Sequence, residues 1–549
     1  MPDIVILNGR VITFDGPDAE ALAITGGTIT AVGSTAEIRD LAEGARVIDA
    51  QGGTVLPGFI DSHVHLFGGS AELDFLNLTG VYGAEALAAA VRPYAASRPD
   101  DALLFACSID YGLMGDRGIT RHDLDAAMPD RPFAACTADH HTIYANTKAL
   151  EAAGLLHGKE VAEGSEVVMG PDGLATGELL EADAFGPIMA MTTFGGREML
   201  GMVTGADPVP APDAATRAID KAVLAKGLQH CASKGITGLH NMDGNFYQLG
   251  LLSEMEAEGT LLCRTEIPMH LKHTDPVERV REAAEMNAQY SSDMLWSRRV
   301  KMFMDGVLDS RTAFMLDPYP GTDICGEPLF SDAQFKQVCV MADRMGLQIA
   351  VHAIGDAAVR QTLDGYEAAR VANGVRDSRH RIEHIETIHP DDIPRLKQLG
   401  VVASMQPLHS PRGGFFLPPY APGEILHAHQ LQTAFPWRAV QDSGAALIFS
   451  TDWPVVPVDV MPTIQGAVAG VDLPSDWPDQ RIGLRDALAA YTRDNAWVEF
   501  NETRKGRLRV GMMADVVVLD ADVEAVAPDQ IGAITAAVTI CGGRITYQA

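Results

Sequence analysis

The chain has 549 residues, well beyond the roughly 250 of one plain α/β barrel, so we expect a large domain with insertions and a smaller one. Its formal net charge of −31 argues against nucleic acid or an anionic membrane as a partner, because both attract basic patches. It has seven cysteines without a C-x-x-C pair, no signal-peptide pattern at the N-terminus and no apolar run near the ~18 residues of a membrane span, so we expect a cytoplasmic protein.

Both ends of the chain have the pattern of β-hairpins. Residues 4–13 contain an Asn-Gly turn between two apolar runs, and residues 21–32 repeat the pattern around Gly26-Gly27. Near the C-terminus, residues 514–519 and 538–546 do the same, with Gly542-Gly543 at the turn. Isolated hairpins are only marginally stable, so we expect both ends to build one small sheet domain into which the middle is inserted.

The middle of the chain alternates apolar strands with amphipathic helices, which predicts a parallel sheet covered by helices. The clearest strands are residues 235–241, 299–305, 348–353, 380–386, 401–406 and 445–452. Residues 67–234 are less regular and contain strand candidates at 102–109 and 133–137. We expect this part to be an insertion that covers one end of a barrel.

The first candidate chemistry follows the apolar run 54–57. His63 and His65 lie two residues apart, so on a strand they share a face. Two neutral imidazoles side by side hold a divalent transition metal well. The alternative is a pair of ordinary polar residues at a strand end, since a bare His-x-His spacing is common.

Other predicted strands also carry residues that bind metals, namely Lys301, His352, His384 and Asp452. Each has an ordinary explanation: a strand-end histidine is usually structural, a buried lysine needs a partner, and an aspartate after a strand often caps a helix. Together with the first pair they place four histidines and one aspartate at successive strand ends. The carboxyl ends of the strands are the working face of a (β/α)8 barrel.

Longer motifs run nearly the length of the chain. They are PGFIDSHVH at 57–65, DHHTIYANTKAL at 139–150, DG with TG and Glu181 at 172–181, VK to SRTA at 300–313, HAIGD at 352–356, RHRIEH at 379–384, STDWPV at 450–455, AYT at 490–492, and Gly506 to Asp515. By these motifs the sequence resembles the amidohydrolase superfamily, specifically its YtcJ-like branch, which includes N-substituted formamide deformylases. His-x-His is shared by the superfamily, whereas SRTA, HAIGD, RIEH and SxDWPV are typical of the branch.

The sequence departs from the branch at positions that line the pocket. The branch more often has Gly, Trp, Ser, Gly and Arg where this chain has His140, Tyr144, Thr147, Asp309 and Ala357. The metal ligands are unaffected, but no substrate is carried over from a relative. The apolar residues 413–420 are predicted to form a loop that either walls an apolar pocket or packs at a subunit interface.

The resemblance implies a composite fold: a metal-dependent (β/α)8 TIM barrel with insertions and a small β-sandwich built from both chain termini. We place the two parts of the sandwich at residues 1–56 and 505–549, and the barrel at 57–504. The resemblance assigns the more buried metal to His63, His65 and Asp452, and a second metal to His352 and His384. The expected metal is zinc, with iron or manganese as alternatives, and the sequence does not separate one ion from two.

The resemblance also implies that CO2 converts Lys301 to a carbamate, an oxygen ligand able to bridge two metals. This modification removes the charge of a lysine in an apolar strand; without it, Lys301 is a buried cation or a substrate contact. A Lewis-acid metal activates water near neutral pH, and Asp452 is the expected general base.

Four residues are predicted to contact the substrate: His141, Tyr144, Arg311 and His240. His141 aligns with a family histidine and would contact the substrate or the oxyanion, although a structural loop histidine is the alternative. Arg311 could instead pair with Asp305 or Asp309. The other histidines, including His409 and the pair His427 and His429, have no such support.

We therefore predict a metal-dependent amidohydrolase that cleaves the C–N bond of a small amide-like molecule, such as an N-formyl or N-acyl amine, by a metal-activated water. The alternatives are an esterase or lactonase on the same metal site, and a barrel that binds metal and ligand without turnover. The expected partner is a small-molecule substrate, and we expect a homodimer.

Overall fold

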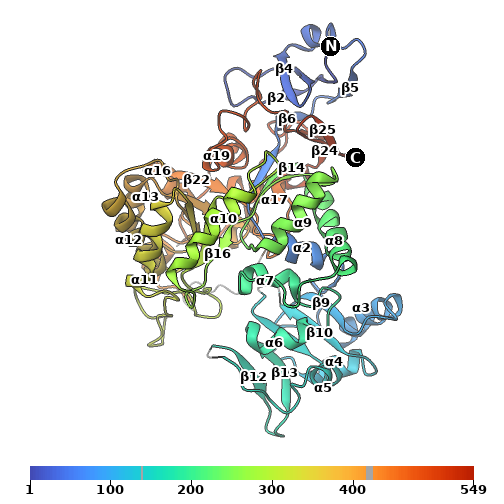
Figure 1. Ribbon diagram of the computed structural model, residues 1–549, viewed down its shortest axis with the longest axis vertical. Coiled ribbons are helices and arrows are strands. Elements are labelled where there is room, and N and C mark those ends of the chain that lie inside the picture. Colours follow the sequence, from blue (N-terminus) through green and yellow to red (C-terminus); the bar gives the residue numbers. More distant parts are fainter. Residues whose placement is uncertain (138–139, 163, 416–424, 476) are drawn as a thin grey trace. The chain divides into compact units, whose positions relative to one another are not determined.

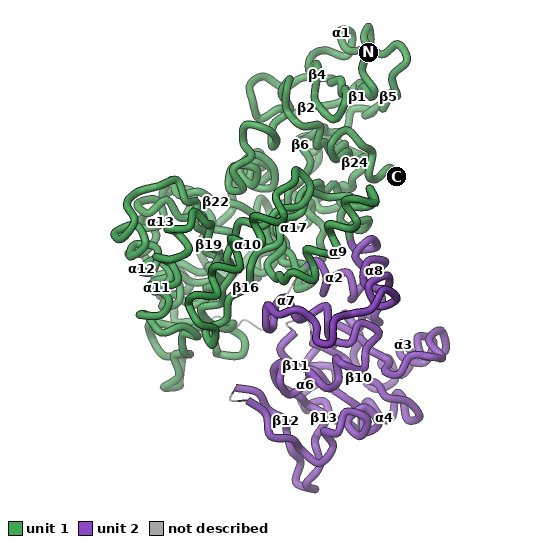
Figure 2. The backbone as a smooth tube through the Cα atoms, in the orientation of Figure 1, with its two compact units in different colours: residues 1–65, 228–549 green, residues 66–227 purple. Residues whose placement is uncertain are grey.

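The computed structural model describes residues 1–549 except 138–139, 163, 416–424 and 476 (Figure 1). The chain forms two compact units, residues 1–65 with 228–549 and residues 66–227 (Figure 2). The first unit contains both termini and every predicted metal ligand from His63 to Asp452. Among the helices of the described residues, none combines the length and apolar character that crossing a bilayer requires.

The two chain ends build two sheets in the first unit. One has the order β4-β3-β1-β5, from β1 (Ile4–Leu7), β3 (Ala21–Thr25), β4 (Thr28–Gly33) and β5 (Arg46–Asp49). The other has the order β2-β6-β23-β24-β25, from β2 (Arg10–Val11), β6 (Thr54–Pro57), β23 (Val516–Leu519), β24 (Ala536–Cys541) and β25 (Arg544–Gln548). Apolar side chains of both sheets, among them Ile6, Ile24, Val55, Val518 and Ile540, pack into one hydrophobic core.

Two of the three predicted hairpins are confirmed. Strands β3 and β4 pair around Gly26-Gly27, and β24 and β25 pair around Gly542-Gly543; all four glycines have the positive φ that such turns need. The prediction of a hairpin over residues 4–13 is wrong. The turn at Asn8, with φ of 56°, carries the chain from one sheet to the other, where β2 pairs with β6 instead of β1.

The middle of the first unit contains two sheets whose strands all run parallel. The first has the order β17-β15-β14-β7, and the second has the order β16-β18-β19-β20-β21-β22. The strands are β7 (Phe59–Val64), β14 (Ile236–Asn241), β15 (Arg264–Glu266), β16 (Met269–His270), β17 (Leu295–Trp296), β18 (Arg299–Phe303), β19 (Gln348–Ala353), β20 (Arg381–His384), β21 (Val402–Met405) and β22 (Ala446–Phe449). All six strands predicted here exist, most of them a few residues shorter than expected.

Helices lie between these strands along the chain, as parallel connections require. They include α9 (Phe246–Ala257), α10 (Arg281–Gln289), α11 (Asp332–Arg344), α12 (Asp356–Asn373), α13 (Ile393–Leu399) and α16 (Trp437–Ser443), and α19 (Arg493–Val498) follows the last of these strands, β22. The segment after β22 returns to β7, where Val64 and Trp453 form a parallel bridge and the Ser62 hydroxyl donates to the Phe449 carbonyl at 3.1 Å. These contacts connect the second parallel sheet to the first.

The second unit has a sheet and cores of its own. Its strands follow the order β12-β13-β11-β10-β9-β8, from β8 (Leu76–Asn77), β9 (Leu104–Ile109), β10 (Phe133–Thr137), β11 (Thr142–Ala145), β12 (Glu166–Met169) and β13 (Ala175–Leu180). Helices α3 (Ala84–Ser97) and α4 (Arg121–Ala127) contribute to one of its two hydrophobic cores. Both strands predicted in this part are present, but the expected irregular insertion is an ordered sheet.

A buried ion pair joins the parallel strands to the C-terminal strands. The Arg264 guanidinium on β15 donates to both oxygens of Asp515, at 2.7 and 3.1 Å, and both side chains are almost fully buried. Removal of one member of a buried pair leaves the other charge without its partner, which is more costly than the loss of an exposed pair.

We expect Asp515→Ala to lower the free energy of unfolding by about 3–5 kcal/mol, because Arg264 would stay buried and charged. Asp293→Ala is the matched control: it removes the carboxylate that Arg504 contacts through two hydrogen bonds at an exposed position, which costs about 0–1 kcal/mol. Urea denaturation followed by circular dichroism measures both. Equal losses in the two variants would contradict the account.

Candidate metal centre

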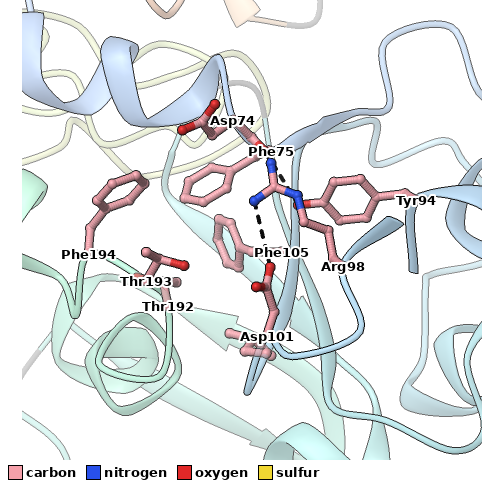
Figure 3. A pocket seen from close by; sticks show the side chains of 10 residues that line it. Asp74, Phe75, Tyr94, Arg98, Asp101, Phe105, Thr192, Thr193 and Phe194 are labelled. Carbon is pink, nitrogen blue, oxygen red and sulfur yellow. Dashed lines mark hydrogen bonds and ion pairs between the residues drawn. The ribbon is translucent and has the colours of Figure 1, made fainter. Parts of the chain in front are cut away.

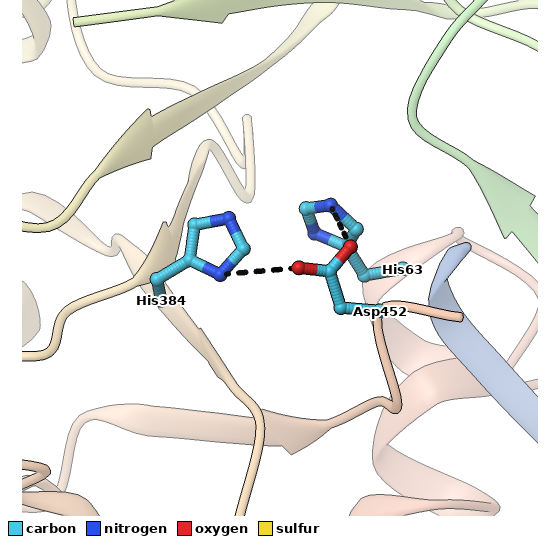
Figure 4. Close-up of side chains that lie close together, drawn as sticks. All are labelled: His63, His384 and Asp452. Atoms are coloured by element: carbon cyan, nitrogen blue, oxygen red, sulfur yellow. Dashed lines mark ion pairs between the residues drawn. The ribbon is translucent and has the colours of Figure 1, made fainter. Parts of the chain in front are cut away.

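Three side chains from distant parts of the chain meet in the first unit (Figure 4). His63 lies on β7, His384 ends β20, and Asp452 follows β22. One nitrogen or oxygen atom of each lies within 4.8 Å of the others, and all three residues are buried. The structure thus brings together residues that the sequence separates by more than three hundred positions.

Hydrogen bonds between β7 and the turn after β22 hold this arrangement. The Thr451 hydroxyl and amide donate to the Asp61 carboxylate at 2.6 and 3.1 Å, and the Asp452 amide donates to the His63 carbonyl at 2.8 Å. Asp452 and His384 both have positive φ, 65° and 78°. Such backbone costs about 1–3 kcal/mol for a residue other than glycine and is concentrated at functional sites.

Each of three histidines has its Nδ1 atom held by an outer partner. The pairs are His63 with Glu383 at 2.9 Å, His65 with Asp243 at 3.2 Å, and His384 with Gln406 at 2.9 Å. The partner oxygens accept hydrogen bonds, so Nδ1 carries the hydrogen in each ring. When the ring is neutral, this leaves Nε2 as the nitrogen with a free lone pair, which is how metal-binding histidines are usually oriented.

The side chains around Asp452 fit a cation. The Nε2 atoms of His63 and His65 each lie 3.3 Å from Asp452 Oδ1. Within the described residues, this buried oxygen forms no hydrogen bond of proper geometry. A buried carboxylate oxygen without a hydrogen bond is costly, and a metal ion between it and the two imidazoles would satisfy all three atoms.

The charges of these groups also suit a metal. Burial lowers the pKa of His63 to about 4, so this ring is neutral at neutral pH. Burial alone would lower the pKa of His65, but its hydrogen bond to Asp243 and the negative charges of Asp243 and Asp452 raise it to about 9. Burial would raise the pKa of Asp452, yet its interactions with the adjacent rings of His63, His65 and His384 hold it well below its ordinary value, so the carboxylate is ionised.

Lys301 and His352 lie on the neighbouring strands β18 and β19. Burial lowers the pKa of Lys301 to about 8, and in the described part of the chain its Nζ atom has no hydrogen-bond partner; it lies 4.4 Å from the centre of the Phe303 ring. The His352 ring centre lies 4.5 Å from that of His384. His352 Nε2 donates to the Gly306 carbonyl at 3.0 Å, which leaves Nδ1 as the atom open to a metal.

One further histidine, His409, reaches this group, although the sequence analysis found no support for it. The His409 ring stacks parallel to that of His384, and its Nε2 lies 3.7 Å from Asp452 Oδ2. Its Nδ1 lies 3.8 Å from Glu386 Oε1. His409 is four residues past the end of β21, outside any strand, so the strand-end pattern could not find it.

The predicted substrate contacts have varied surroundings. In the second unit, His141 Nδ1 lies 2.9 Å from Glu181 Oε1, and the hydroxyl of the buried Tyr144 donates to Glu178 at 3.0 Å. Arg311 is exposed, with φ of 58°. The roles of these residues stay predictions. Residue 139 of the same motif and residues 416–420 of the predicted apolar loop lie outside the described residues.

His240 is fully buried, and both of its ring nitrogens are engaged by protein groups. Nε2 lies 2.8 Å from Glu499 Oε2, and Nδ1 lies 3.0 Å from an Arg381 Nη1 atom. This position favours a role inside the protein over the predicted contact with substrate.

A cavity in the second unit is too small to be a substrate pocket (Figure 3). It has a volume of about 30 Å³ and is lined by side chains such as Arg98, Asp101 and Phe105, none of them a predicted site residue. Ligand pockets for small molecules typically measure ~300–1,000 Å³, so this space suits water and not a substrate.

Comparison with known proteins identifies the class. A sequence model of the amidohydrolase family matches residues 46–547. Putative amidohydrolase YtcJ of Bacillus subtilis (strain 168) is 26% identical over 97% of both chains, and the N-substituted formamide deformylase of Arthrobacter pascens is 24% identical over 100% of this chain and 99% of that one. The crystal structure of an uncharacterised metal-dependent hydrolase from Pyrococcus furiosus, 26% identical, superimposes with a TM-score of 0.69 over 93% of this chain and 98% of that chain.

The chain therefore belongs to the amidohydrolase family. It is a hydrolase that acts on carbon–nitrogen bonds other than peptide bonds, and its predicted resemblance to the YtcJ-like branch is confirmed.

We expect metal binding to strengthen as the pH rises from about 7 to 9. The metal-free His65 has a pKa of about 9, above its ordinary value, so it carries a proton below that pH, and a metal must displace this proton. One displaced proton corresponds to roughly a tenfold gain in affinity per pH unit. Calorimetric titration with Zn²⁺ in buffers of different ionisation enthalpy measures both the affinity and the protons released.

Asp243→Asn is the matched variant, since it removes one of the two carboxylates that raise the pKa of His65. The rise in affinity should then move to lower pH. A metal affinity that does not change with pH over this range in the unaltered protein would contradict the assignment of His65 as a ligand.

Proposed function

We propose that the protein hydrolyses the C–N bond of a small N-formyl or N-acyl amine with a metal held by His63, His65 and Asp452. The observation that carries the proposal is the position of the buried Asp452 Oδ1 atom, which lies 3.3 Å from the Nε2 atoms of His63 and His65. The Nδ1 atom of each of these two rings is already held by a carboxylate. The Arthrobacter relative is an N-substituted formamide deformylase, which supports an N-formyl substrate.

We also propose that the two parallel sheets close into one (β/α)8 barrel and that the two terminal sheets form a β-sandwich. The contacts between β7 and the segment after β22 support closure, and the core shared by the terminal sheets supports the sandwich. In such a barrel the carboxyl ends of the strands form the active face. The domain limits at 56 and 504, the cytoplasmic location and the homodimer stay predictions.

A second ion or a carbamate would be held by the residues next to this centre. Lys301 on β18 and His352 on β19 lie on neighbouring strands, and His352 lies next to His384. Among the residues that the structure describes, the buried Lys301 Nζ atom has no hydrogen-bond partner, which suits modification by CO2. The burial that lowers its pKa to about 8 keeps a fraction of the amine neutral, and the neutral amine is the form that reacts. Zinc fits the mixed imidazole and carboxylate donors; iron and manganese are the alternatives.

When bound, the metal supplies a Lewis acid that makes water a nucleophile near neutral pH. The side chains of the protein then transfer the protons. Asp452, ionised and buried beside the histidines, takes the proton of the attacking water and later gives it to the leaving nitrogen. The C–N bond breaks, the carbonyl carbon keeps the water oxygen as a carboxylic acid, and the amine leaves with the proton. His141 remains the predicted contact for the substrate or its oxyanion.

The experiment that tests this function pairs amides with esters. Metal-loaded protein is incubated with N-substituted formamides and N-acyl amines, and with esters and lactones of matched size, and products are identified by mass. We expect cleavage of the amides and a loss of about 10²–10⁴-fold in rate for Asp452→Asn, the contribution typical of a general base. Cleavage of esters alone would favour the esterase, and an active Asp452→Asn would exclude Asp452 as the base.

Lys301→Ala should lower the metal content per chain, because the variant removes the amine that a carbamate requires. Elemental analysis of protein purified with excess metal and bicarbonate measures the content. Addition of formate or acetate should restore part of it, since a small carboxylate supplies the missing oxygen ligand. Unchanged metal stoichiometry would contradict the carbamate and leave Lys301 as an ordinary buried amine.

A further inference from the structure

The outer partner of His63 is part of a buried ion pair. Arg381 and Glu383, two residues apart on β20, are both fully buried, and the guanidinium donates to the two carboxylate oxygens at 2.6 and 2.7 Å. The oxygen at 2.7 Å also accepts from His63 Nδ1. Arg381 further donates to the Ser62 carbonyl at 2.7 Å, directly next to His63, and to the Ser404 hydroxyl at 2.8 Å. The pair on β20 is therefore fixed to two other strands, β7 and β21.

A series of further buried contacts leads from Arg381 away from the metal centre. Arg381 Nη1 lies 3.0 Å from His240 Nδ1, His240 Nε2 lies 2.8 Å from Glu499, and Glu499 lies 2.7 Å from Lys505 Nζ. All of these residues are buried. Cations and anions alternate along the series, with a histidine in the middle, so no charge is left without a partner of opposite sign.

The direction of each hydrogen bond follows from the chemistry of the donors. A guanidinium only donates, so His240 Nδ1 accepts and His240 Nε2 carries the hydrogen that Glu499 accepts. At the other end an ionised Glu383 only accepts, so His63 Nδ1 carries the hydrogen. The tautomers of both imidazole rings in the series, His240 and His63, are thus determined. The lone pair of His63 Nε2 faces Asp452.

The other histidines of the centre have different outer partners. His384 has the neutral amide of Gln406, and His65 has the carboxylate of Asp243, which accepts from the amide of Gln248. Of these three outer partners, only Glu383, which contacts His63, is paired with a buried arginine within the described residues. An anionic partner makes an imidazole a stronger metal ligand, and such outer residues change metal affinity by about 10–100-fold.

We propose that Arg381 and Glu383, held in place by His240 and Glu499, are positioning residues that fix the tautomer and orientation of His63 and so set the metal affinity of the centre. The proposal rests on the proposed function in one respect, that His63 is a metal ligand. It adds a role for four residues that do not touch the substrate. It also gives His240 a task other than substrate contact.

Two variants test the proposal by metal affinity and not by turnover. Glu383→Gln keeps an oxygen for His63 Nδ1 but removes the negative charge, and should weaken Zn²⁺ binding by about 10–100-fold in a chelator competition. Because this variant leaves Arg381 buried without its carboxylate and could fail to fold, the second test is at His240. His240→Leu removes the acceptor of Arg381 Nη1 and should weaken binding by a smaller factor, whereas His240→Asn, which keeps an acceptor near the Nδ1 position, should restore it.

Asp515→Ala is the matched control, since it breaks a buried arginine–carboxylate pair that, among the described residues, shares no hydrogen bond or ion pair with this series. It should lower stability without a change in Zn²⁺ affinity, and the absorption spectrum of the Co²⁺-loaded protein should shift in Glu383→Gln but not in Asp515→Ala. Wild-type affinity in folded Glu383→Gln, or equal affinities in His240→Leu, His240→Asn and the wild type, would overturn the proposal. A wild-type protein that binds no metal would overturn the proposed function itself, which keeps the two failures distinct.

Discussion

The structure depends on one buried carboxylate held against two imidazoles. Among the described residues, Asp452 Oδ1 forms no hydrogen bond of proper geometry, and the backbone of Asp452 is in a left-handed conformation that disfavours residues other than glycine. Both features cost free energy, and the hydrogen bonds of Thr451 to Asp61 keep the turn in place despite them. A protein that maintains such a turn gains from it only when a cation completes the group, which is why the metal is central to our account.

Buried charge is distributed in pairs throughout the first unit. Arg264 with Asp515 and Arg381 with Glu383 are two examples, and in both the guanidinium contacts two carboxylate oxygens. Such pairs add little net stability over apolar packing, because the desolvation of two ions offsets their attraction. Their value lies in geometry: a planar guanidinium fixes a carboxylate, and the carboxylate fixes the ring of His63.

Much of this could be read from the sequence, and the exceptions have physical reasons. The parallel strands and the residues His63, His384 and Asp452 were predictable because apolar strands alternate with helices and because strand ends converge. The hairpin over residues 4–13 was not, since an Asn-Gly turn fixes the local backbone but not the sheet that the next strand joins. The sheet of the second unit was underestimated because its short strands mix parallel and antiparallel pairing, so they show no regular alternation of strands and helices.

The site shows the same division. Ligands on strands follow a period of two, so they are visible in the sequence. His409 lies in a loop and reaches Asp452 only through the tertiary fold. Glu383 was visible as a charged residue in an apolar strand, and such a residue must have a buried partner. The sequence could not show that this partner network includes Arg381 on the same strand and leads to His63 on another.

The most direct measurement is anomalous X-ray diffraction from crystals grown with zinc. The account predicts an anomalous peak bonded to Nε2 of His63, Nε2 of His65 and a carboxylate oxygen of Asp452, at the ~2.0–2.2 Å typical of zinc. An ion bound elsewhere, or Asp452 turned away to hydrogen bond with protein groups in zinc-saturated crystals, would contradict it.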